Sequence, residues 1–86
     1  MKEHGTFELE LKGQLIIVRA FDAWNIETSQ SLCNNYLKLV DKIKDKPWGC
    51  FVDLTKWEHG TPDMWEPIDE TNAWAKKHNQ KFEAVV

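Results

Sequence analysis

Hydrophobic and polar positions alternate near the start of the chain, in Thr6–Lys12. The apolar positions are Phe7, Leu9 and Leu11, and the polar positions between them are Glu8, Glu10 and Lys12. A period of two with one polar side is typical of a half-buried strand at the edge of a sheet. The turn that follows contains Gly13, which takes a positive φ easily.

A second predicted strand, residues 15–21, is apolar on both sides except at Arg19. This pattern places it inside the sheet, and the short turn before it makes an antiparallel hairpin with the first strand. Apolar residues then recur every three or four positions, which predicts an amphipathic helix over residues 26–44. Asn25 is its expected N-cap, and Pro47 prevents its continuation.

A short apolar run, residues 50–54, predicts a buried parallel strand, and residues 55–61 are expected to form a loop. Thr61 and Pro62 are typical of a helix start, but Pro67 disfavours helical geometry just before it. We therefore expect a separate turn at residues 62–65 and a helix over residues 67–78, ended by Asn79 in a left-handed conformation. The inner face of this helix is predicted to hold Ile68, Thr71, Asn72 and Ala75, with Trp74 beside it.

Residues 81–86 form the last predicted strand, so the element order is β-β-α-β-α-β. We predict an α/β fold in which a four-stranded mixed sheet carries both helices on one face, because strand–helix–strand crossovers are right-handed. The other face of the sheet is then uncovered. Residues 1–86 are expected to be a single domain, and the end of the chain within an apolar strand suggests that a C-terminal portion is missing.

Composition narrows the class of protein. Of 86 residues, 42% are hydrophobic and 29% charged, which is typical of a globular domain. The sequence has no long apolar run and no N-terminal export signal, and its two cysteines, Cys33 and Cys50, are well separated. These features predict a cytoplasmic protein without disulfides. The net charge of −3 does not suggest nucleic-acid binding.

A resemblance to a known family rests on the segment Asp53-Leu54-Thr55. This segment lies at the end of an apolar strand and before a loop and a helix. With the element order, it resembles the STAS fold of bacterial anti-sigma-factor antagonists, and in particular the SpoIIAA-like branch of small uncharacterised proteins. STAS proteins typically carry Asp-Leu-Ser at this strand end. The resemblance implies this fold and a regulatory role through protein contacts.

The phosphoserine switch that the resemblance implies lacks its motif in this chain. STAS proteins carry Asp-Ser-x-Gly before the next helix, whereas residues 57–61 read Trp-Glu-His-Gly-Thr, and no serine follows Cys50. Thr61 is the nearest hydroxyl, but Asp63 and Glu66 would repel a phosphate there. We therefore predict that no phosphorylation switch operates.

Polar and aromatic residues follow the second and third predicted strands. The carboxyl ends of neighbouring parallel strands meet at one edge of a sheet, so these residues are expected at one rim, as a binding site for a small molecule or lipid. The alternative is that they cap the helix, bond loop amides and fill a thin core. The candidate ligand-binding residues are Asp22, Trp24, Asn25, Asp53, Thr55 and Trp57.

Catalytic and metal-binding chemistry have little support. Asp53, Glu58, His59 and Asp63 could supply metal ligands, but they show no recognised metal-site spacing. Both cysteines lie in apolar surroundings, and no nucleophile motif or phosphate-binding loop occurs. We expect no enzyme activity, no cofactor and no metal.

Aromatic and acidic residues mark a candidate interaction surface. Residues 53–70 hold six acids and one base, a net charge of −5, so the rest of the chain carries +2. The acids could meet a basic partner or simply stabilise the start of the second helix. Tryptophans concentrate at protein interfaces. The predicted interaction residues are Trp57, His59, Thr61 and Trp65.

The sequence thus leads to two functional hypotheses. The first is a non-enzymatic, STAS-like regulatory domain that acts through protein–protein contacts, as a homodimer or with another protein. The second is a carrier or sensor of a small molecule or lipid, with its pocket at the carboxyl ends of the second and third strands.

Overall fold

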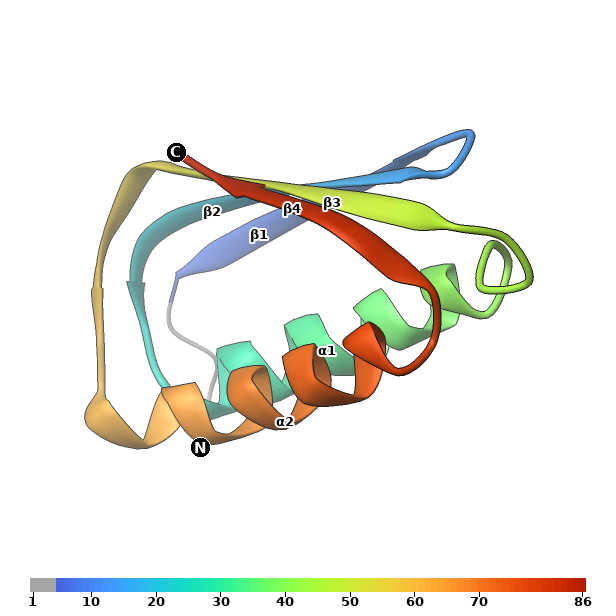
Figure 1. Cartoon of the computed structure of the whole chain (residues 1–86). Helices are drawn as coiled ribbons and strands as arrows, with labels where there is room; N and C mark the ends of the chain where they lie inside the picture. Colours follow the sequence, from blue (N-terminus) through green and yellow to red (C-terminus); the bar gives the residue numbers. More distant parts are fainter. Residues whose placement is uncertain (1–4) are drawn as a thin grey trace.

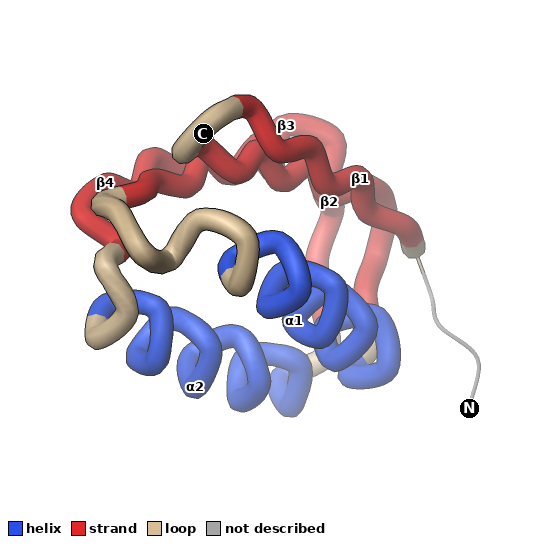
Figure 2. Tube along the Cα trace, turned by 90° about the vertical axis from the view of Figure 1, so that its right-hand side faces the viewer, coloured by secondary structure: helices blue, strands red, loops and turns tan. Residues whose placement is uncertain are grey.

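Four strands form one mixed sheet, and two helices lie against the same face of it (Figures 1 and 2). This computed structural model describes residues 5–86. The prediction that the chain has no export signal depends partly on residues 1–4, which lie outside the described residues. The strand order is β1-β2-β3-β4, with β1 antiparallel to β2 and the other pairs parallel. The elements are β1 (Thr6–Lys12), β2 (Leu15–Trp24), α1 (Ile26–Val40), β3 (Trp48–Gly60), the 3₁₀ turn η1 (Pro62–Met64), α2 (Trp65–Lys76) and β4 (Gln80–Val85). The predicted fold class and element order are confirmed.

The hairpin of β1 and β2 pairs Thr6 with Phe21 and Lys12 with Leu15. Gly13 in its turn has a φ of 58°, as predicted. The apolar side of β1 packs on the core through Phe7, Leu9 and Leu11. The edge strand β1 therefore turns its apolar side toward the core, as its alternating pattern predicted.

Helix α1 begins as predicted and ends earlier. The Asn25 side chain accepts hydrogen bonds from the Thr28 amide (3.1 Å) and hydroxyl (2.9 Å). After Val40 the chain turns more tightly, because the amides of Lys42 and Ile43 bond to carbonyls three residues earlier. The predicted end at residue 44 was wrong, although Ile43 still reaches the core, where it is buried.

Strands β2 and β3 are both longer than predicted. The predicted loop over residues 55–61 was wrong, because β3 continues to Gly60 and pairs with an extension of β2 that ends at Trp24. Two irregularities in their register, at Arg19/Phe21 and Asp22/Ala23, bend this ribbon toward the helices (Figure 1). Asp22 takes a φ of 64° there, a conformation that aspartate tolerates better than most residues.

Helix α2 follows η1 directly. The predicted separate turn before the helix is confirmed, and Pro67 lies in the first turn of α2, where its missing amide breaks no helical bond. The predicted bounds of residues 67–78 were wrong at both ends, because α2 begins two residues earlier, at Trp65, and ends two residues earlier, at Lys76. Ala75 is fully buried, and Asn79 has the predicted left-handed conformation, with a φ of 73°.

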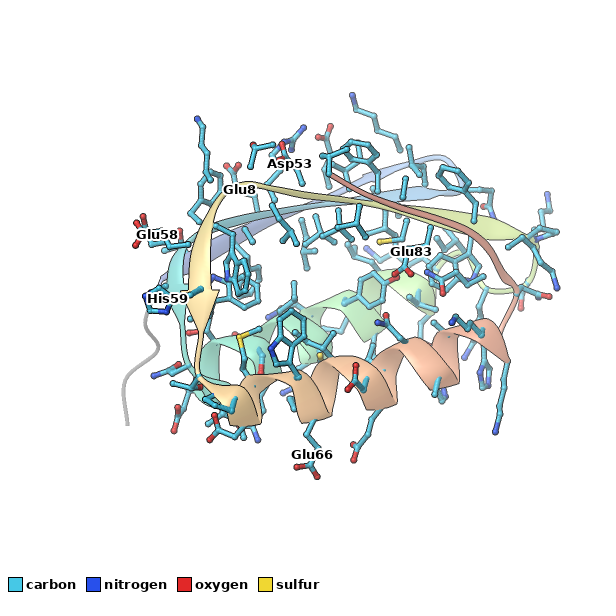
Figure 3. All side chains as sticks on the ribbon, turned by 60° about the vertical axis from the view of Figure 1, so that its left-hand side comes forward. Glu8, Asp53, Glu58, His59, Glu66 and Glu83 are labelled. Atoms are coloured by element: carbon cyan, nitrogen blue, oxygen red, sulfur yellow. The ribbon has the colours of Figure 1, made fainter. Side chains whose placement is uncertain are left out.

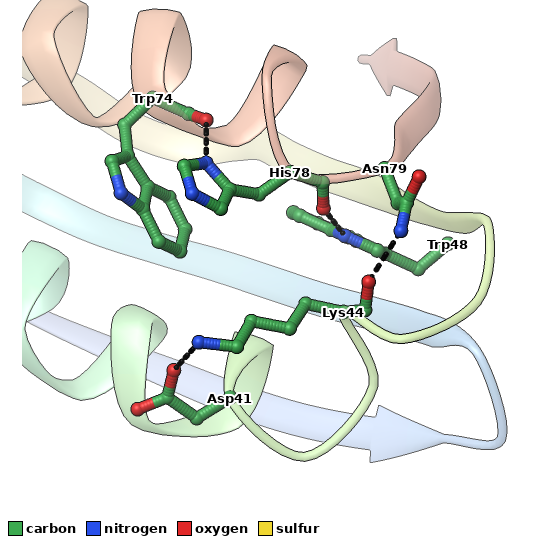
Figure 4. Close-up of polar contacts among 6 residues, drawn as sticks. All are labelled: Asp41, Lys44, Trp48, Trp74, His78 and Asn79. Atoms are coloured by element: carbon green, nitrogen blue, oxygen red, sulfur yellow. Dashed lines mark hydrogen bonds and ion pairs between the residues drawn. The ribbon is translucent and has the colours of Figure 1, made fainter.

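Polar contacts close the end of the molecule at the C-terminus of α2 (Figure 4). The indole N–H of Trp48 donates a hydrogen bond of 2.7 Å to the backbone carbonyl of His78. The side-chain amide of Asn79 donates one of 2.5 Å to the backbone carbonyl of Lys44. The His78 ring stacks on Trp74 with centroids 4.0 Å apart.

The main core lies beside these contacts, between α1 and the centre of the sheet. Its buried members include Ile16, Val18, Tyr36, Val40 and Trp48.

The face of the sheet opposite the helices is uncovered among the described residues (Figure 2). Because side chains alternate along a strand, Ile17 and Phe51 point away from the buried Ile16 and Cys50. Phe82 lies over Gly49 on this face and is 56% exposed. The predicted uncovered face is therefore confirmed, and part of it is apolar.

No helix of the described residues is long and apolar enough to cross a membrane.

Candidate functional site

A cavity of about 300 Å³ lies between the sheet and α2. Its lining is mostly apolar and comes from β2, β3, β4, η1 and both helices, so no single segment of the sequence contains it. Trp65, Glu83 and Val85 are the exposed residues of the lining and mark where the cavity meets solvent. Further lining residues are Ala20, Leu32, Val52, Leu54 and Met64.

Tryptophans from the bent ribbon of β2 and β3 form one end of the cavity. Trp24 is buried, and its indole N–H donates to the carbonyls of Thr6 and Phe21, both at 3.1 Å. Its one polar group is therefore bonded to backbone. Trp57 meets Trp65 of α2 edge to face, with ring centroids 5.8 Å apart. This pair links the ribbon to the helix at the edge of the cavity.

The inner face of α2 forms the opposite wall. Ile68, Thr71 and Asn72 all line the cavity, which confirms the helix face predicted from the sequence. Ile68 supplies apolar surface, whereas Thr71 and Asn72 supply a hydroxyl and an amide. This wall therefore offers a few polar groups beside a large apolar surface, as small-molecule sites usually do.

Two thiols and a phenol lie on the inner side of the cavity. Burial raises the pKa of the Cys50 thiol to about 11 and raises the pKa of the Cys33 thiol above its ordinary value. Burial also raises the pKa of Tyr36 well above its usual range. The Cys33 thiol donates a weak hydrogen bond to the carbonyl of Pro67, at 3.4 Å. At neutral pH these groups are uncharged, so they extend the apolar lining and are poor nucleophiles.

The candidate ligand-binding residues are brought together only in part. Trp24 and Trp57 line the cavity, whereas Asn25 caps α1 and Asp22 is exposed in the bulge. Asp53 and Thr55 lie on the uncovered face of the sheet, where Figure 3 shows Asp53 near Glu8 and far from the helices. The expected single rim was wrong, because β2 and β3 bend and continue past the positions where they were expected to end.

Asp53 has a local structural role on the uncovered face. Its carboxylate accepts hydrogen bonds from the Thr55 hydroxyl (2.7 Å) and amide (2.9 Å). These bonds, with the smaller effect of Arg19 and Lys56, lower the pKa of Asp53. The side chain of Asp53 is therefore held by hydrogen bonds to the residue two positions later in the strand. Leu54, which lies between Asp53 and Thr55, lines the cavity on the other side of the sheet.

The predicted interaction residues do not form one contact group. Trp57 and Trp65 pack together, but His59 is exposed and points away from the cavity in Figure 3. The Thr61 hydroxyl donates to Asp63, at 2.6 Å. Their role in binding a partner stays a prediction. Among residues 5–86, no group of three or more His, Cys, Asp or Glu is placed to hold a metal ion.

Sequence reasoning missed several lining residues, above all Met64, Glu83 and Val85. Met64 was assigned to a turn, yet it is 1% exposed. Glu83 and Val85 lie on the last strand, whose alternation is a usable signal: residues 83 and 85 share one side and residues 82 and 84 the other. That signal does not say which side faces the helices, because both sides carry apolar residues.

Solved structures share this fold at low sequence identity. A crystal structure of an uncharacterized DUF3478-family protein with a SpoIIAA-like fold, from Shewanella loihica PV-4, matches with a TM-score of 0.69 and 11% identity, over 100% of this chain and 69% of that one. The structure of a protein named Mglu matches with a TM-score of 0.73 and 10% identity, over 90% of this chain but only 18% of Mglu. No family model and no curated protein matches the sequence. The fold is therefore SpoIIAA-like, as the resemblance in the sequence implied.

Proposed function

We propose that this SpoIIAA-like domain binds a small apolar molecule, or the apolar chain of a lipid, in the cavity between its sheet and α2. The observation that carries the proposal is the cavity itself, about 300 Å³ in volume and lined mostly by apolar and aromatic side chains. This volume lies at the lower end of the range for small-molecule sites, about 300–1,000 Å³. It suits a single ring system or a short acyl chain.

The energetics of an apolar cavity support the same function. Empty space in a core costs about 24 cal/mol per Å³ in large-to-small substitutions, because the lining loses packing contacts. The cavity opens to solvent at Trp65, Glu83 and Val85, so an apolar ligand can enter it and displace water from its mostly apolar lining. A ligand that fills the space restores these contacts, so binding stabilises the folded chain.

We propose further that the domain acts by binding, without catalysis. The only thiols of the described residues are Cys33 and Cys50, which burial keeps protonated, and the lining holds no histidine. A nucleophile needs a neighbouring base or a lowered pKa. The lining therefore suits recognition of a ligand better than attack on it.

A thermal unfolding series with 1-decanol tests the proposal. A ligand that binds only the folded state stabilises it by RT ln(1 + [L]/Kd), about 1.4 kcal/mol at ten times Kd. For a domain of this size we expect a rise in Tm of roughly 5–10 °C. The change should be dose-dependent and should saturate.

Two substitutions on α2 make the test specific. Thr71→Phe puts a large ring into the cavity and is expected to abolish the rise in Tm with decanol. Ala73→Phe puts the same ring on the exposed side of α2, where decanol should still act as in the wild type. A Tm that decanol leaves unchanged, a rise that survives Thr71→Phe, or a rise that Ala73→Phe abolishes contradicts the proposal.

A second candidate function is protein–protein contact through the uncovered face of the sheet. It is favoured by the apolar side chains on that face, with Phe82 56% exposed. Large exposed apolar patches mark interaction sites. Native mass spectrometry of the wild type and of Phe82→Ser tests it: we expect a homodimer that the substitution converts to monomer. A wild-type monomer at micromolar concentration counts against self-association.

A further inference from the structure

Glu83 places a negative charge at the mouth of an otherwise uncharged cavity. Glu83 is on β4 and lines the cavity, while its neighbour Phe82 lies on the opposite face over Gly49. Figure 3 shows the Glu83 side chain pointing from the sheet toward the helices. The lining contains no lysine, arginine or histidine, so Glu83 is its only residue with a charged side chain at neutral pH.

The surroundings of Glu83 show that this charge reaches the inside of the cavity. Its negative field adds to burial in raising the pKa values of Cys50 and Tyr36, two groups on the inner wall. Among residues 5–86 the ion pairs are Lys12–Glu10, Arg19–Glu10 and Lys44–Asp41, and none involves Glu83. The carboxylate is therefore available to an incoming group.

We propose that the cavity selects amphiphiles with a cationic head group, such as a protonated amine, and rejects the carboxylates of fatty acids. This inference rests on the proposed binding of an apolar chain in the cavity. The chain would lie among the apolar residues, and the ammonium group would meet Glu83 where the cavity opens to solvent. An anionic head group would face the same carboxylate, and the lining offers it no lysine, arginine or histidine.

The aromatic residues at the mouth act in the same direction. Trp57 and Trp65 pack edge to face there, and the face of an indole ring attracts cations electrostatically. Thr71 and Asn72, on the helix wall, offer polar groups that accept an ammonium hydrogen bond. Because Thr71 and Asn72 can donate as well as accept, the preference for a cation rests on the Glu83 carboxylate and the indole rings.

Three probes with the same ten-carbon chain separate charge from apolar binding: decylammonium and decanoate, each below its critical micelle concentration, and 1-decanol below its solubility limit. Dissociation constants are measured at pH 7 by calorimetry at low ionic strength. Because Glu83 is exposed, its attraction for one head group and repulsion of the other are each modest. We expect decylammonium to bind roughly tenfold more tightly than decanoate, with decanol between them.

Two glutamate substitutions identify the source of the selectivity. Glu83→Gln keeps the shape of the side chain and removes its charge, so decylammonium and decanoate should then bind within about twofold of each other. Glu66→Gln is the matched control, because Glu66 is exposed, does not line the cavity and points outward from α2 in Figure 3. It should keep the tenfold preference. Unchanged binding of neutral decanol by both variants shows that they are folded.

The outcomes separate this inference from the proposed function. If all three probes bind the wild type equally, or decanoate binds best, the charge selectivity is overturned and apolar binding stands. A preference that survives Glu83→Gln also overturns it. If none of the three probes binds, the proposed function itself fails.

Discussion

Gly60 shows how a single residue shapes the cavity wall. A Cβ at this position would overlap the sulfur of Met64 and lie 3.0 Å from its Cγ, although the backbone of Gly60 itself is not left-handed. Met64 is 1% exposed and lines the cavity. Glycine at the end of β3 therefore lets the Met64 side chain lie close against the strand.

We predict that Gly60→Ala lowers the free energy of unfolding by about 1 kcal/mol, the lower end of the cost of overpacking, because the flexible Met64 side chain can move toward the cavity. Urea denaturation measures the loss. In a Met64→Ala background the same change should cost less than about 0.5 kcal/mol, because the overlapping side chain is gone. Equal losses in both backgrounds would show that the close contact is not the cause.

Cys50 gives the stability a dependence on alkaline pH. Burial raises the pKa of its thiol from 9.0 to about 11, so the folded chain holds a proton that the unfolded chain releases. The thiol's contribution is fully present below about pH 9 and is lost as the pH rises through about 11. At about 1.36 kcal/mol per pKa unit, the loss approaches about 2–3 kcal/mol.

Urea denaturation at pH 8 and at pH 11 checks this prediction by comparing the wild type with Cys50→Ala. Tyr36, whose pKa burial also raises, contributes to the decline of both proteins. The wild type should therefore lose about 2–3 kcal/mol more than the variant over this interval. Parallel declines would mean that Cys50 is not held protonated.

At the scale of elements, the start of α1 depends on its N-cap. Asn25 is 6% exposed, and its side chain bonds both the amide and the hydroxyl of Thr28. We predict that Asn25→Ala lowers the free energy of unfolding by about 1–2 kcal/mol, the cost of losing such a cap. Asn34→Ala, at an exposed position within the same helix, should be neutral or slightly stabilising. Chemical denaturation distinguishes them, and equal effects would refute the capping role.

Most elements could be predicted because local patterns and packing agree. The hairpin turn at Gly13, the cap at Asn25 and the turn at Asn79 between α2 and β4 all have the conformations that their residues favour. The extension of β3 over residues 55–60 could not be predicted. It is polar and exposed at most positions, and it is a strand because it pairs with the extension of β2. That pairing is a tertiary effect which no local propensity reports.

At the scale of the whole molecule, the cavity arises from how the layers are joined. The bent ribbon of β2 and β3 closes one end of the cavity through Trp24 and Trp57, and at the opposite end of the molecule the contacts of Trp48, His78 and Asn79 hold the C-terminus of α2 in place (Figures 1 and 4). The inner face of α2 forms the wall of the cavity opposite β2, β3 and β4. The sequence predicted two of its aromatic residues, Trp24 and Trp57, but not the cavity, because its walls come from six separate elements.

A titration of the isotope-labelled protein with 1-decanol, followed by heteronuclear NMR, tests whether the cavity between the sheet and α2 binds an apolar chain. We expect saturable chemical-shift changes at cavity residues such as Ala20, Cys33 and Ile68. Ile17 and Phe82, on the uncovered face of the sheet, should change little. Changes confined to the uncovered face, or no saturable changes at the cavity residues, would contradict ligand binding in the cavity.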